Sequence, residues 1–343
     1  MLKPKIPHEK IEQLRNLISG ADNILLTAHM SPDGDAMGST LAMREVLLAA
    51  GKNVSVVTPD SPLEYLMFIP GSKEIVSGRK YPDFAKELFE KADLIICMDF
   101  NAPYRVDNLE QLLLNSKAGK VLIDHHTDPD DFCDLVFSYP EECSTCMLTF
   151  RIISQLGWMN WMNKNAAEAI CTGMMTDTGN FTYSDSDPDI YLVLSELIRK
   201  GVDKDRIYKL AFNTKSVDRF NLEAYALSNK LTLYPEKRAA VITLTLEELN
   251  RFRYKPGNTE GLVNMRLAIP EILYVAFFRE GNDYVKVSCR SEGDIPVNKL
   301  CADYYNGGGH KNAAGGEFKG TMEEAVEIFK KAMDEYEQYL PEY

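Results

Sequence analysis

The sequence predicts an α/β protein with a mostly parallel sheet flanked by helices in its first domain and a smaller α/β domain after it. The chain has 343 residues, enough for about two domains of ordinary size. In the first half, short and almost entirely apolar segments alternate with helical patterns, which is typical of parallel strands buried on both faces. The last third contains its own strand and helix patterns, so we expect it to fold as a separate α/β unit.

The elements of the first domain are expected in a regular order. A helix is predicted over residues 8–19, followed by a strand, NILLTAH, and a second helix over residues 38–50. Three further apolar segments read as strands: NVSVVTP, ADLIICMD and KVLID. Of these segments, NILLTAH ends in a histidine, and ADLIICMD and KVLID end in an aspartate. In an open α/β sheet, the C-terminal ends of the strands form the edge that binds ligands.

Residues 143 to about 210 show a helical pattern with breaks at Gly157, at residues 177–180 and at Gly201. A connecting helix is predicted over 216–230, and four strands follow: LTLYPE, AAVITLTL, EILYVAFF and DYVKVSC. A helix over 296–305, a glycine cluster and an amphipathic helix over 321–339 complete the chain. We expect a first domain at 1–190, a helical linker at 191–230 and a second domain at 231–343, with a ligand cleft between the two domains.

Composition narrows the function classes. With 38 basic and 51 acidic residues the net charge is −13, so we expect no binding to long duplex nucleic acid, which requires many phosphate contacts from Lys and Arg. Neither a membrane-spanning apolar segment nor a signal-peptide core is visible, and a cytoplasmic protein is expected. The seven cysteines are scattered. Cys143 and Cys146 form a CxxC pattern, but no second pair accompanies it, which argues against a zinc or redox site.

Side chains that commonly bind metals follow several of the predicted strands. The segment TAHMSPDGDAMGS carries three of them, one follows DLIICM, three follow KVLI, and one lies in GMMTDTGNF: His29, Asp33, Asp35, Asp99, Asp124, His125, His126 and Asp177. Histidine and carboxylates without a thiolate favour a hard divalent ion such as Mn²⁺ or Mg²⁺. Each residue taken alone could equally be a helix cap or a core group. Their joint occurrence predicts a metal site.

The charge balance favours two ions over one. Asp33, Asp35, Asp99 and Asp177 would repel one another if crowded without cations. Two divalent ions cancel these four charges, can hold phosphoryl oxygens and can lower the pKa of a water, which is the chemistry of phosphoester hydrolysis. Since adjacent residues of a strand face opposite ways, we expect one residue of the pair His125 and His126 to be a ligand and the other to face the phosphate or support the ligands.

A second group of candidate residues lies near the C-terminus. In NGGGHKNAAGG, the backbone of Gly307, Gly308 and Gly309 can approach a phosphate closely, and His310 adds positive charge. On the strand DYVKVSC and the residue after it, Ser288 and Arg290 share the polar face, and an arginine fork can hold a phosphate with two hydrogen bonds. A surface turn and a solvated strand edge are the alternatives.

Five segments, taken in order, resemble the motifs of DHH phosphoesterases that carry a C-terminal DHHA1 domain. They are HMSPDGDAMGS, the aspartate of CMDF, DHH at 124–126, GMMTDTGNF and GGGH at 307–310. The likeness spans nearly the whole chain. The length and the absence of extra domains make the chain similar to the oligoribonuclease and pAp-phosphatase branch, the nanoRNases, where pAp is 3′-phosphoadenosine 5′-phosphate.

This resemblance implies a binuclear manganese site, with Mg²⁺ as the other candidate ion. It implies His29, Asp33 and Asp99 at one ion, and Asp35, Asp99, His125 and Asp177 at the other, so that Asp99 bridges. Asp124 would support the ligands, and His126 would lie beside the scissile phosphate as a catalytic group. Arg290, Ser288, His310 and the backbone of 307–309 would hold a substrate phosphate.

The function we expect is therefore Mn²⁺-dependent hydrolysis of short oligoribonucleotides, linear dinucleotides or pAp. Neither long duplexes nor membranes are expected as partners, and a homodimer is compatible with the sequence. One alternative is a polyphosphate or pyrophosphate hydrolase with the same metal core. The other is a non-catalytic nucleotide-binding module. Comparing the turnover of a dinucleotide with that of pyrophosphate tests the first alternative. Measuring whether bound nucleotide is converted to product tests the second.

Overall fold

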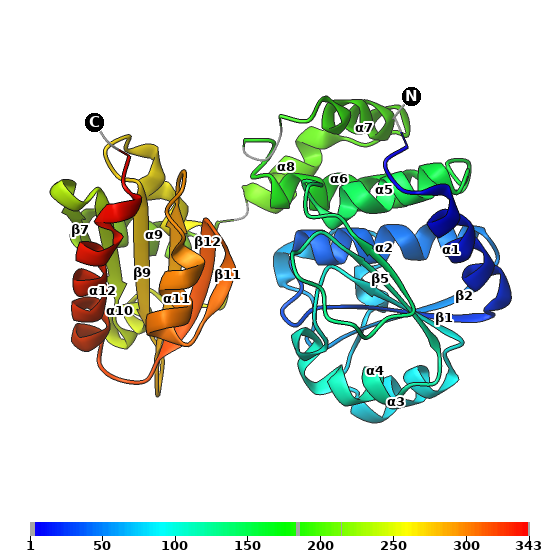
Figure 1. Cartoon of the computed structure of the whole chain (residues 1–343), viewed down its shortest axis with the longest axis horizontal. Helices are drawn as coiled ribbons and strands as arrows, with labels where there is room; N and C mark the ends of the chain where they lie inside the picture. Colours follow the sequence, from blue (N-terminus) through cyan, green and yellow to red (C-terminus); the bar gives the residue numbers. More distant parts are fainter. Residues whose placement is uncertain (1–3, 183–185, 214, 342–343) are drawn as a thin grey trace. The chain divides into compact units, whose positions relative to one another are not determined.

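The chain divides into two compact units, residues 1–214 and 215–343 (Figure 1). The computed structural model describes residues 4–182, 186–213 and 215–341. Within these ranges, no helix is both long enough and apolar enough to cross a membrane.

The first unit is built on a six-stranded sheet in the order β3-β2-β1-β4-β5-β6, with every pair of neighbours parallel. Its central strand β4 is buried at each of its five residues, as a strand covered on both faces must be. The predicted parallel sheet is confirmed. The short edge strands β3 and β6 were not predicted, because two and four residues give too little pattern to detect. The bounds are β1 Asn23–Ala28, β2 Asn53–Thr58, β3 Val76–Ser77, β4 Leu94–Met98, β5 Gly119–Asp124 and β6 Leu135–Ser138.

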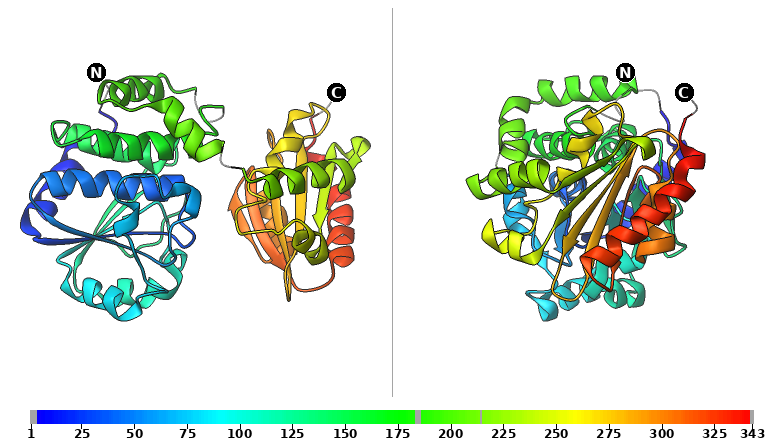
Figure 2. Two further views of the ribbon diagram at one scale, coloured as in Figure 1. Left: turned by 180° about the vertical axis from the view of Figure 1, so that it is seen from behind. Right: turned by 90° about the vertical axis from the view of Figure 1, so that its left-hand side faces the viewer.

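Helices cover both faces of this sheet (Figures 1 and 2). On one face lie α3 (Pro82–Lys91) and α4 (Glu110–Asn115), which share a core with alternate residues of β1, β4 and β5. On the other face, α2 contacts the strands and α6 packs across α2. Because α2 is enclosed in this way, it is buried on nearly all sides in its first ten residues. The helices of this face and beyond it are α1 His8–Gly20, α2 Gly34–Ala49, α5 Thr145–Gln155, α6 Lys164–Asp177, α7 Pro188–Arg199 and α8 Lys204–Phe212.

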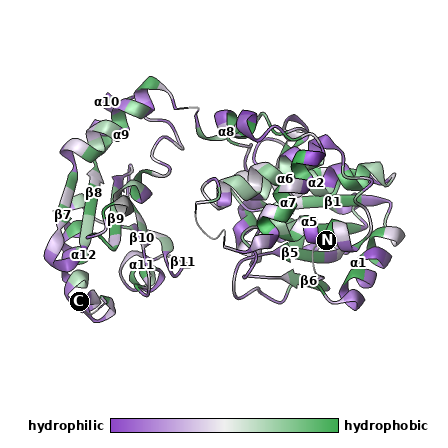
Figure 3. Cartoon of the chain, turned by 90° about the horizontal axis from the view of Figure 1, so that it is seen from above, coloured by the Kyte–Doolittle hydropathy of each residue, from purple (hydrophilic) through white to green (hydrophobic). Residues whose placement is uncertain are grey.

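The second unit has a mixed six-stranded sheet in the order β11-β12-β10-β9-β8-β7, in which only β8 and β9 pair in parallel. One face packs against α11 and α12, and α9 and α10 cover part of the other. Apolar residues concentrate on the inner strands β8 and β9 of this sheet (Figure 3). The bounds are α9 Val217–Asn229, β7 Leu231–Tyr234, β8 Ala239–Leu244, α10 Leu246–Arg251, β9 Tyr274–Glu280, β10 Val285–Ser291, α11 Val297–Tyr305, β11 Gly308–His310, β12 Ala313–Phe318 and α12 Met322–Tyr336.

The glycine cluster near the C-terminus is a β-hairpin, whereas the sequence predicted no strand there. Strand β11 pairs antiparallel with β12. A Cβ atom on Gly307 would lie 2.0 Å from the carbonyl oxygen of Gly315, and one on Gly309 would lie 2.6 Å from that of Ala313. Two of the three glycines are thus required by the close approach of two backbones. Strand propensity does not reveal this, because glycine has a low one.

Candidate metal centre

Strand β1 and helix α2 position the first three candidate residues. His29 follows the last residue of β1, and its Nδ1 lies 2.8 Å from the carbonyl oxygen of Met30. Asp33 is the N-cap of α2, where its carboxylate accepts hydrogen bonds from the backbone N–H groups of Asp35 and Ala36. Asp35 lies in the first turn of α2 and is almost completely buried. A strand end and a helix start thus bring one imidazole and two carboxylates to the carboxyl edge of the sheet.

Asp99 lies directly after β4 and has an unusual backbone conformation. Its φ is +64°, in the left-handed region that costs energy for residues other than glycine and is less unfavourable for Asp and Asn. Its Oδ2 lies 3.5 Å from Nε2 of His29, and its Oδ1 lies 3.9 Å from Nε2 of His125. The two oxygens of one carboxylate therefore face two different histidines.

The two histidines after β5 have different surroundings. Nε2 of His125 lies 3.5 Å from Asp177 Oδ2 and 4.0 Å from Asp35 Oδ2, while its Nδ1 lies 3.2 Å from the carbonyl oxygen of Glu142. His126 instead places its Nδ1 2.7 Å from Oδ1 of the fully buried Asp124. The two rings meet at 70°. His125 therefore points Nε2 at the acidic cluster while a carbonyl holds its Nδ1, which is the arrangement that His29 also has.

The structure brings the first candidate group together: seven of its eight residues share groups of neighbouring donor atoms, and the eighth, Asp124, contacts His126. Donor atoms within 4.8 Å of one another form three groups: His29, Asp33 and Asp99; Asp35, His125 and Asp177; and Asp99, His125 and His126. The first two groups join through Asp99, whose oxygens face both histidines. Oxygen and imidazole donors without a thiolate suit Mn²⁺ or Mg²⁺, so the residues present fit a hard divalent cation.

Crowding of acidic groups changes their protonation. Burial, and then the charges of Asp99 and Asp177, raise the pKa of Asp35. Burial and the charge of Asp99 likewise raise the pKa of Asp177. Burial alone would lower the pKa of His29, but its pairing with Asp99 and the nearby carboxylates raise it to about 9. Without cations, the cluster therefore keeps protons that a metal ion would have to displace.

We expect the binding of divalent ions to release protons. The pKa of His29 lies above its ordinary value of 6.5, so the proton stabilises the metal-free fold below that pH, and this contribution is lost as the pH rises through about 9. Metal affinity should rise by about tenfold per pH unit below 9 for each proton displaced. Calorimetry of Mn²⁺ binding between pH 6.5 and 8.5, in buffers of different ionisation enthalpy, measures this release. His29→Gln should reduce it, whereas replacing the exposed His8 with glutamine should not. A pH-independent affinity would contradict the prediction.

The segment that begins α5 contributes residues that the sequence did not single out. The backbone N–H of Thr145 donates to Asp35 Oδ2 at 2.6 Å, and that of Cys146 donates to Asp35 Oδ1 at 2.9 Å. The Thr145 hydroxyl donates to Asp99 Oδ1 at 2.8 Å. These contacts fix two of the candidate ligands. The sequence feature that marks this segment is Ser144, the N-cap of α5. A helix cap does not reveal which groups the N–H groups of the next two residues bind.

The cysteine pattern belongs to the surroundings of this cluster. Cys146 is fully buried, and Cys143 is partly buried with its pKa raised to about 12 by burial and then by the charge of Asp35. Both thiols therefore stay protonated near neutral pH, and neither belongs to a group of donor atoms found among the described residues.

Four residues of the second candidate group, Ser288, Arg290, Gly308 and His310, lie on one face of the sheet in the second unit. Arg290 on β10 and His310 on β11 are both in register with Ala313 of β12, so the three residues share that face. Ser288 and Gly308 are both in register with Gly315, which lies two residues after Ala313 on β12 and therefore on the same face. A Cβ atom added at Gly308 would meet no atom within 4 Å. This face combines polar side chains with small residues that leave its backbone accessible.

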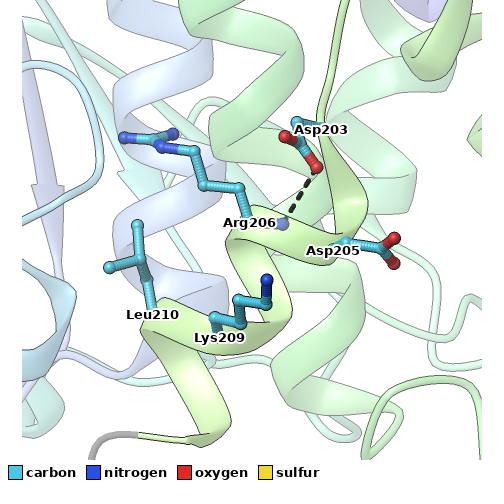
Figure 4. Close-up of a pocket in the computed structure, with 5 residues that line it drawn as sticks. All are labelled: Asp203, Asp205, Arg206, Lys209 and Leu210. Carbon is cyan, nitrogen blue, oxygen red and sulfur yellow. Dashed lines mark hydrogen bonds between the residues drawn. The ribbon is translucent and has the colours of Figure 1, made fainter.

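A surface hollow in the first unit lies apart from the candidate residues in sequence. It is lined by the N-cap of α8 and by residues along that helix, which are Asp203, Asp205, Arg206, Lys209 and Leu210 (Figure 4). Asp203 is the N-cap of α8 and accepts the backbone N–H of Arg206 at 2.9 Å. None of these residues belongs to the groups of metal-type donors described above.

Comparisons with known proteins agree with this arrangement. Residues 23–174 match the DHH family N-terminal domain and residues 238–338 match the DHHA1 domain. A crystal structure of an exopolyphosphatase-related protein from Bacteroides fragilis is 43% identical and superposes with a TM-score of 0.97, covering 99% of this chain and 100% of that one. The bifunctional oligoribonuclease and PAP phosphatase NrnA of Thermus thermophilus is 29% identical over 95% of this chain and 94% of its own. The NrnA of Bacillus subtilis is 27% identical over 89% and 92%. The chain therefore belongs to the DHH family and joins a DHH N-terminal domain to a DHHA1 domain.

Proposed function

We propose that this protein is a phosphoric ester hydrolase that uses two divalent ions, Mn²⁺ or Mg²⁺, to hydrolyse short oligoribonucleotides, linear dinucleotides and pAp. The observation that carries the proposal is a pair of donor groups, one of His29, Asp33 and Asp99 and the other of Asp35, His125 and Asp177. Asp99 links them because its Oδ1 lies 3.9 Å from Nε2 of His125. His29, Asp33 and Asp99 would hold one ion, and Asp35, Asp99, His125 and Asp177 the other. The similarity to proteins named oligoribonuclease and PAP phosphatase supports this substrate class.

When bound, such ions supply positive charge for the phosphoryl oxygens and activate water. The residues of this chain prepare the site for them. The carbonyl oxygens of Met30 and Glu142 lie against Nδ1 of His29 and His125 respectively. An Nδ1–H that donates to such a carbonyl leaves Nε2 as the ligand atom, directed at the carboxylates. The N–H groups of Thr145 and Cys146 hold both oxygens of Asp35.

His126 is proposed as the residue that contacts the scissile phosphate. Its Nδ1 pairs with Asp124 at 2.7 Å. A buried carboxylate in this position fixes the orientation of the ring. Nε2 is the atom that would donate a hydrogen bond to a phosphoryl oxygen or a proton to the leaving oxygen.

The second unit is proposed to bind a terminal phosphate of the substrate. Arg290 can hold it with its planar fork, and Ser288, His310 and the backbone of residues 307–309 lie on or beside the same sheet face. A site that binds a terminal phosphate favours short substrates over long polymers. This agrees with a net charge of −13, which disfavours tracking a long polyanion.

A substrate panel with Mn²⁺ tests the proposed activity. We expect turnover of pAp, the dinucleotide pApA and a five-nucleotide RNA to exceed that of polyphosphate and pyrophosphate. A polyphosphate hydrolase is the second candidate, because the 43% identical Bacteroides fragilis protein is described as exopolyphosphatase-related. Strong preference for polyphosphate would select that candidate. Tight nucleotide binding without product would identify a non-catalytic module instead.

Replacing Arg290 with lysine tests the phosphate site in the second unit. The change keeps the positive charge but removes the two-pronged contact, so we expect KM for pApA to rise by about tenfold while kcat changes little. Arg199→Lys, on the exposed side of α7, is the control and should leave both constants unchanged. Steady-state kinetics on pApA provide the measurement. An unchanged KM in Arg290→Lys would exclude Arg290 from substrate binding.

A further inference from the structure

Five charged side chains of the first unit form a network that is buried at its centre. The guanidinium Nε of Arg151 lies 2.8 Å from Oε1 of Glu142, and the two side chains are 2% and 1% exposed. Nη2 of Arg151 lies 2.9 Å from Asp189. Nearer the surface, Nζ of Lys5 lies 3.1 Å from Glu142 and 2.9 Å from Asp187. The network therefore ties the N-terminal segment, the turn before α5, α5 itself and the start of α7 to one point.

Glu142 connects this network to the metal centre through its backbone. Its carbonyl oxygen lies 3.2 Å from Nδ1 of His125. The backbone N–H of Glu142 donates to the carbonyl oxygen of Tyr139, which closes a turn. Three residues further along, Thr145 contacts both Asp35 and Asp99. The short segment 142–146 thus touches three of the proposed ligands, and the side chain of Glu142 is its anchor.

We propose that Arg151 and Glu142 are positioning residues for the metal centre. Their ion pair fixes the Glu142 carbonyl, which holds His125 with its Nδ1–H directed at that carbonyl and its Nε2 directed at the carboxylates. The inference rests on the proposed function, since it assigns a role toward ions that the candidate ligands would hold. It extends that function to residues that contact neither ions nor substrate.

The desolvation cost of burying these charges favours a positioning role for the network over a purely stabilising role. Desolvation of a buried ion pair largely cancels its electrostatic gain, so a well-packed apolar pair would serve stability equally well. An ion pair with several fixed partners does specify one position of the turn. Groups that hold the second nitrogen of a metal-binding histidine typically change metal affinity by about 10–100-fold when removed.

Glu142→Gln, compared with Glu168→Gln, tests the proposal. Glutamine keeps the size of the side chain and the backbone carbonyl but removes the charge that pairs with Arg151. Glu168 on α6 is the matched control, because it is also nearly buried and pairs with two cations, Lys164 and Arg206. We expect Glu142→Gln to weaken Mn²⁺ binding to the metal-free protein by about tenfold in calorimetry. The control should change it less than about twofold, which is below the range typical of groups that support a ligand.

A spectroscopic measurement separates positioning from mere stabilisation. With Mg²⁺ bound, nitrogen NMR of the imidazole groups should show His125 as the Nδ1–H tautomer in wild type and in Glu168→Gln. In Glu142→Gln we expect the His125 signals to broaden or shift. Should that variant fail to fold, Arg151→Lys keeps the charge without the fork and should show a smaller loss of affinity with the same shift of the His125 signals.

The outcomes distinguish this inference from the proposed function. A folded Glu142→Gln that binds Mn²⁺ as wild type does, with unchanged His125 signals, overturns the inference even if its melting temperature falls. Wild-type protein that binds no divalent ion removes the proposed function, and the inference with it. Weakened binding and altered His125 signals confined to Glu142→Gln and Arg151→Lys support the inference.

Discussion

Replacing Asp99 with asparagine is expected to lower kcat/KM for pApA by about 10³-fold or more, because loss of a shared ligand charge removes several kcal/mol of transition-state stabilisation. Asp99 is the residue through which the two donor groups join. Asparagine suits this position better than alanine, since it tolerates the +64° φ of Asp99 and keeps its shape. The fold should therefore survive while activity is lost. Activity assays at saturating Mn²⁺, with circular dichroism of the same samples, measure both.

Asp93 provides the control for this experiment. It precedes the same strand, β4, at the opposite edge of the sheet, where it accepts backbone hydrogen bonds from Asp22 and Asn23. Asp93→Asn should keep activity within about twofold of wild type, because the change removes a surface charge remote from the reacting atoms. Retention of full activity by Asp99→Asn would be incompatible with a bridging ligand at this position.

Replacing Gly38 with alanine is expected to destabilise the first unit by about 1–2 kcal/mol and to weaken Mn²⁺ binding. An added Cβ would lie 2.5 Å from the carbonyl oxygen of Ala169, a backbone atom that can move only if α6 moves. Forced overpacking of this kind costs about 1–3 kcal/mol, more than the roughly 1 kcal/mol that alanine gains over glycine in a helix. Because α2 carries Asp35 and α6 carries Asp177, separating the helices also separates two proposed ligands.

The same substitution at Gly20 is the control for Gly38→Ala. Gly20 is the last residue of α1, and a Cβ atom added there would meet nothing within 4 Å. Gly20→Ala should leave metal affinity unchanged and change stability by less than about 1 kcal/mol. Denaturant unfolding and Mn²⁺ calorimetry on both variants provide the test. Equal stability and equal affinity in the two variants would show that the contact between α2 and α6 does not position the site.

Much of the architecture follows from local pattern. The continuous apolar segments predicted β1, β2, β4 and β5, because a parallel strand covered on both faces needs no polar side chains along its length. Strand β12 was missed for the opposite reason. Its sequence, AAGGEF, lacks both alternation and β-branched residues. The strand lies between β11 and β10, and a Cβ atom on Gly315 would lie 3.1 Å from the carbonyl oxygen of Val287 on β10.

The candidate site was predictable to the extent that its residues follow strands. The carboxyl edge of a parallel sheet collects such residues, which is why His29, Asp99 and His125 could be grouped from the sequence. Thr145 and Glu142 could not be found in this way. Thr145 contacts Asp35 through its backbone N–H and Asp99 through its hydroxyl. Glu142 contacts His125 through its carbonyl oxygen and Arg151 through its carboxylate. None of these contacts leaves a sequence motif. Contacts between segments more than 100 residues apart, such as Thr145 with Asp35, become visible only when the helices are in place.

Anomalous diffraction from crystals soaked in Mn²⁺ tests whether the first unit holds two divalent ions that share Asp99. We expect two manganese peaks in the first unit, one beside His29, Asp33 and Asp99, the other beside Asp35, His125 and Asp177, with an Asp99 oxygen at each. Crystals without manganese at this edge of the sheet, or with a single ion that does not contact Asp99, would contradict it.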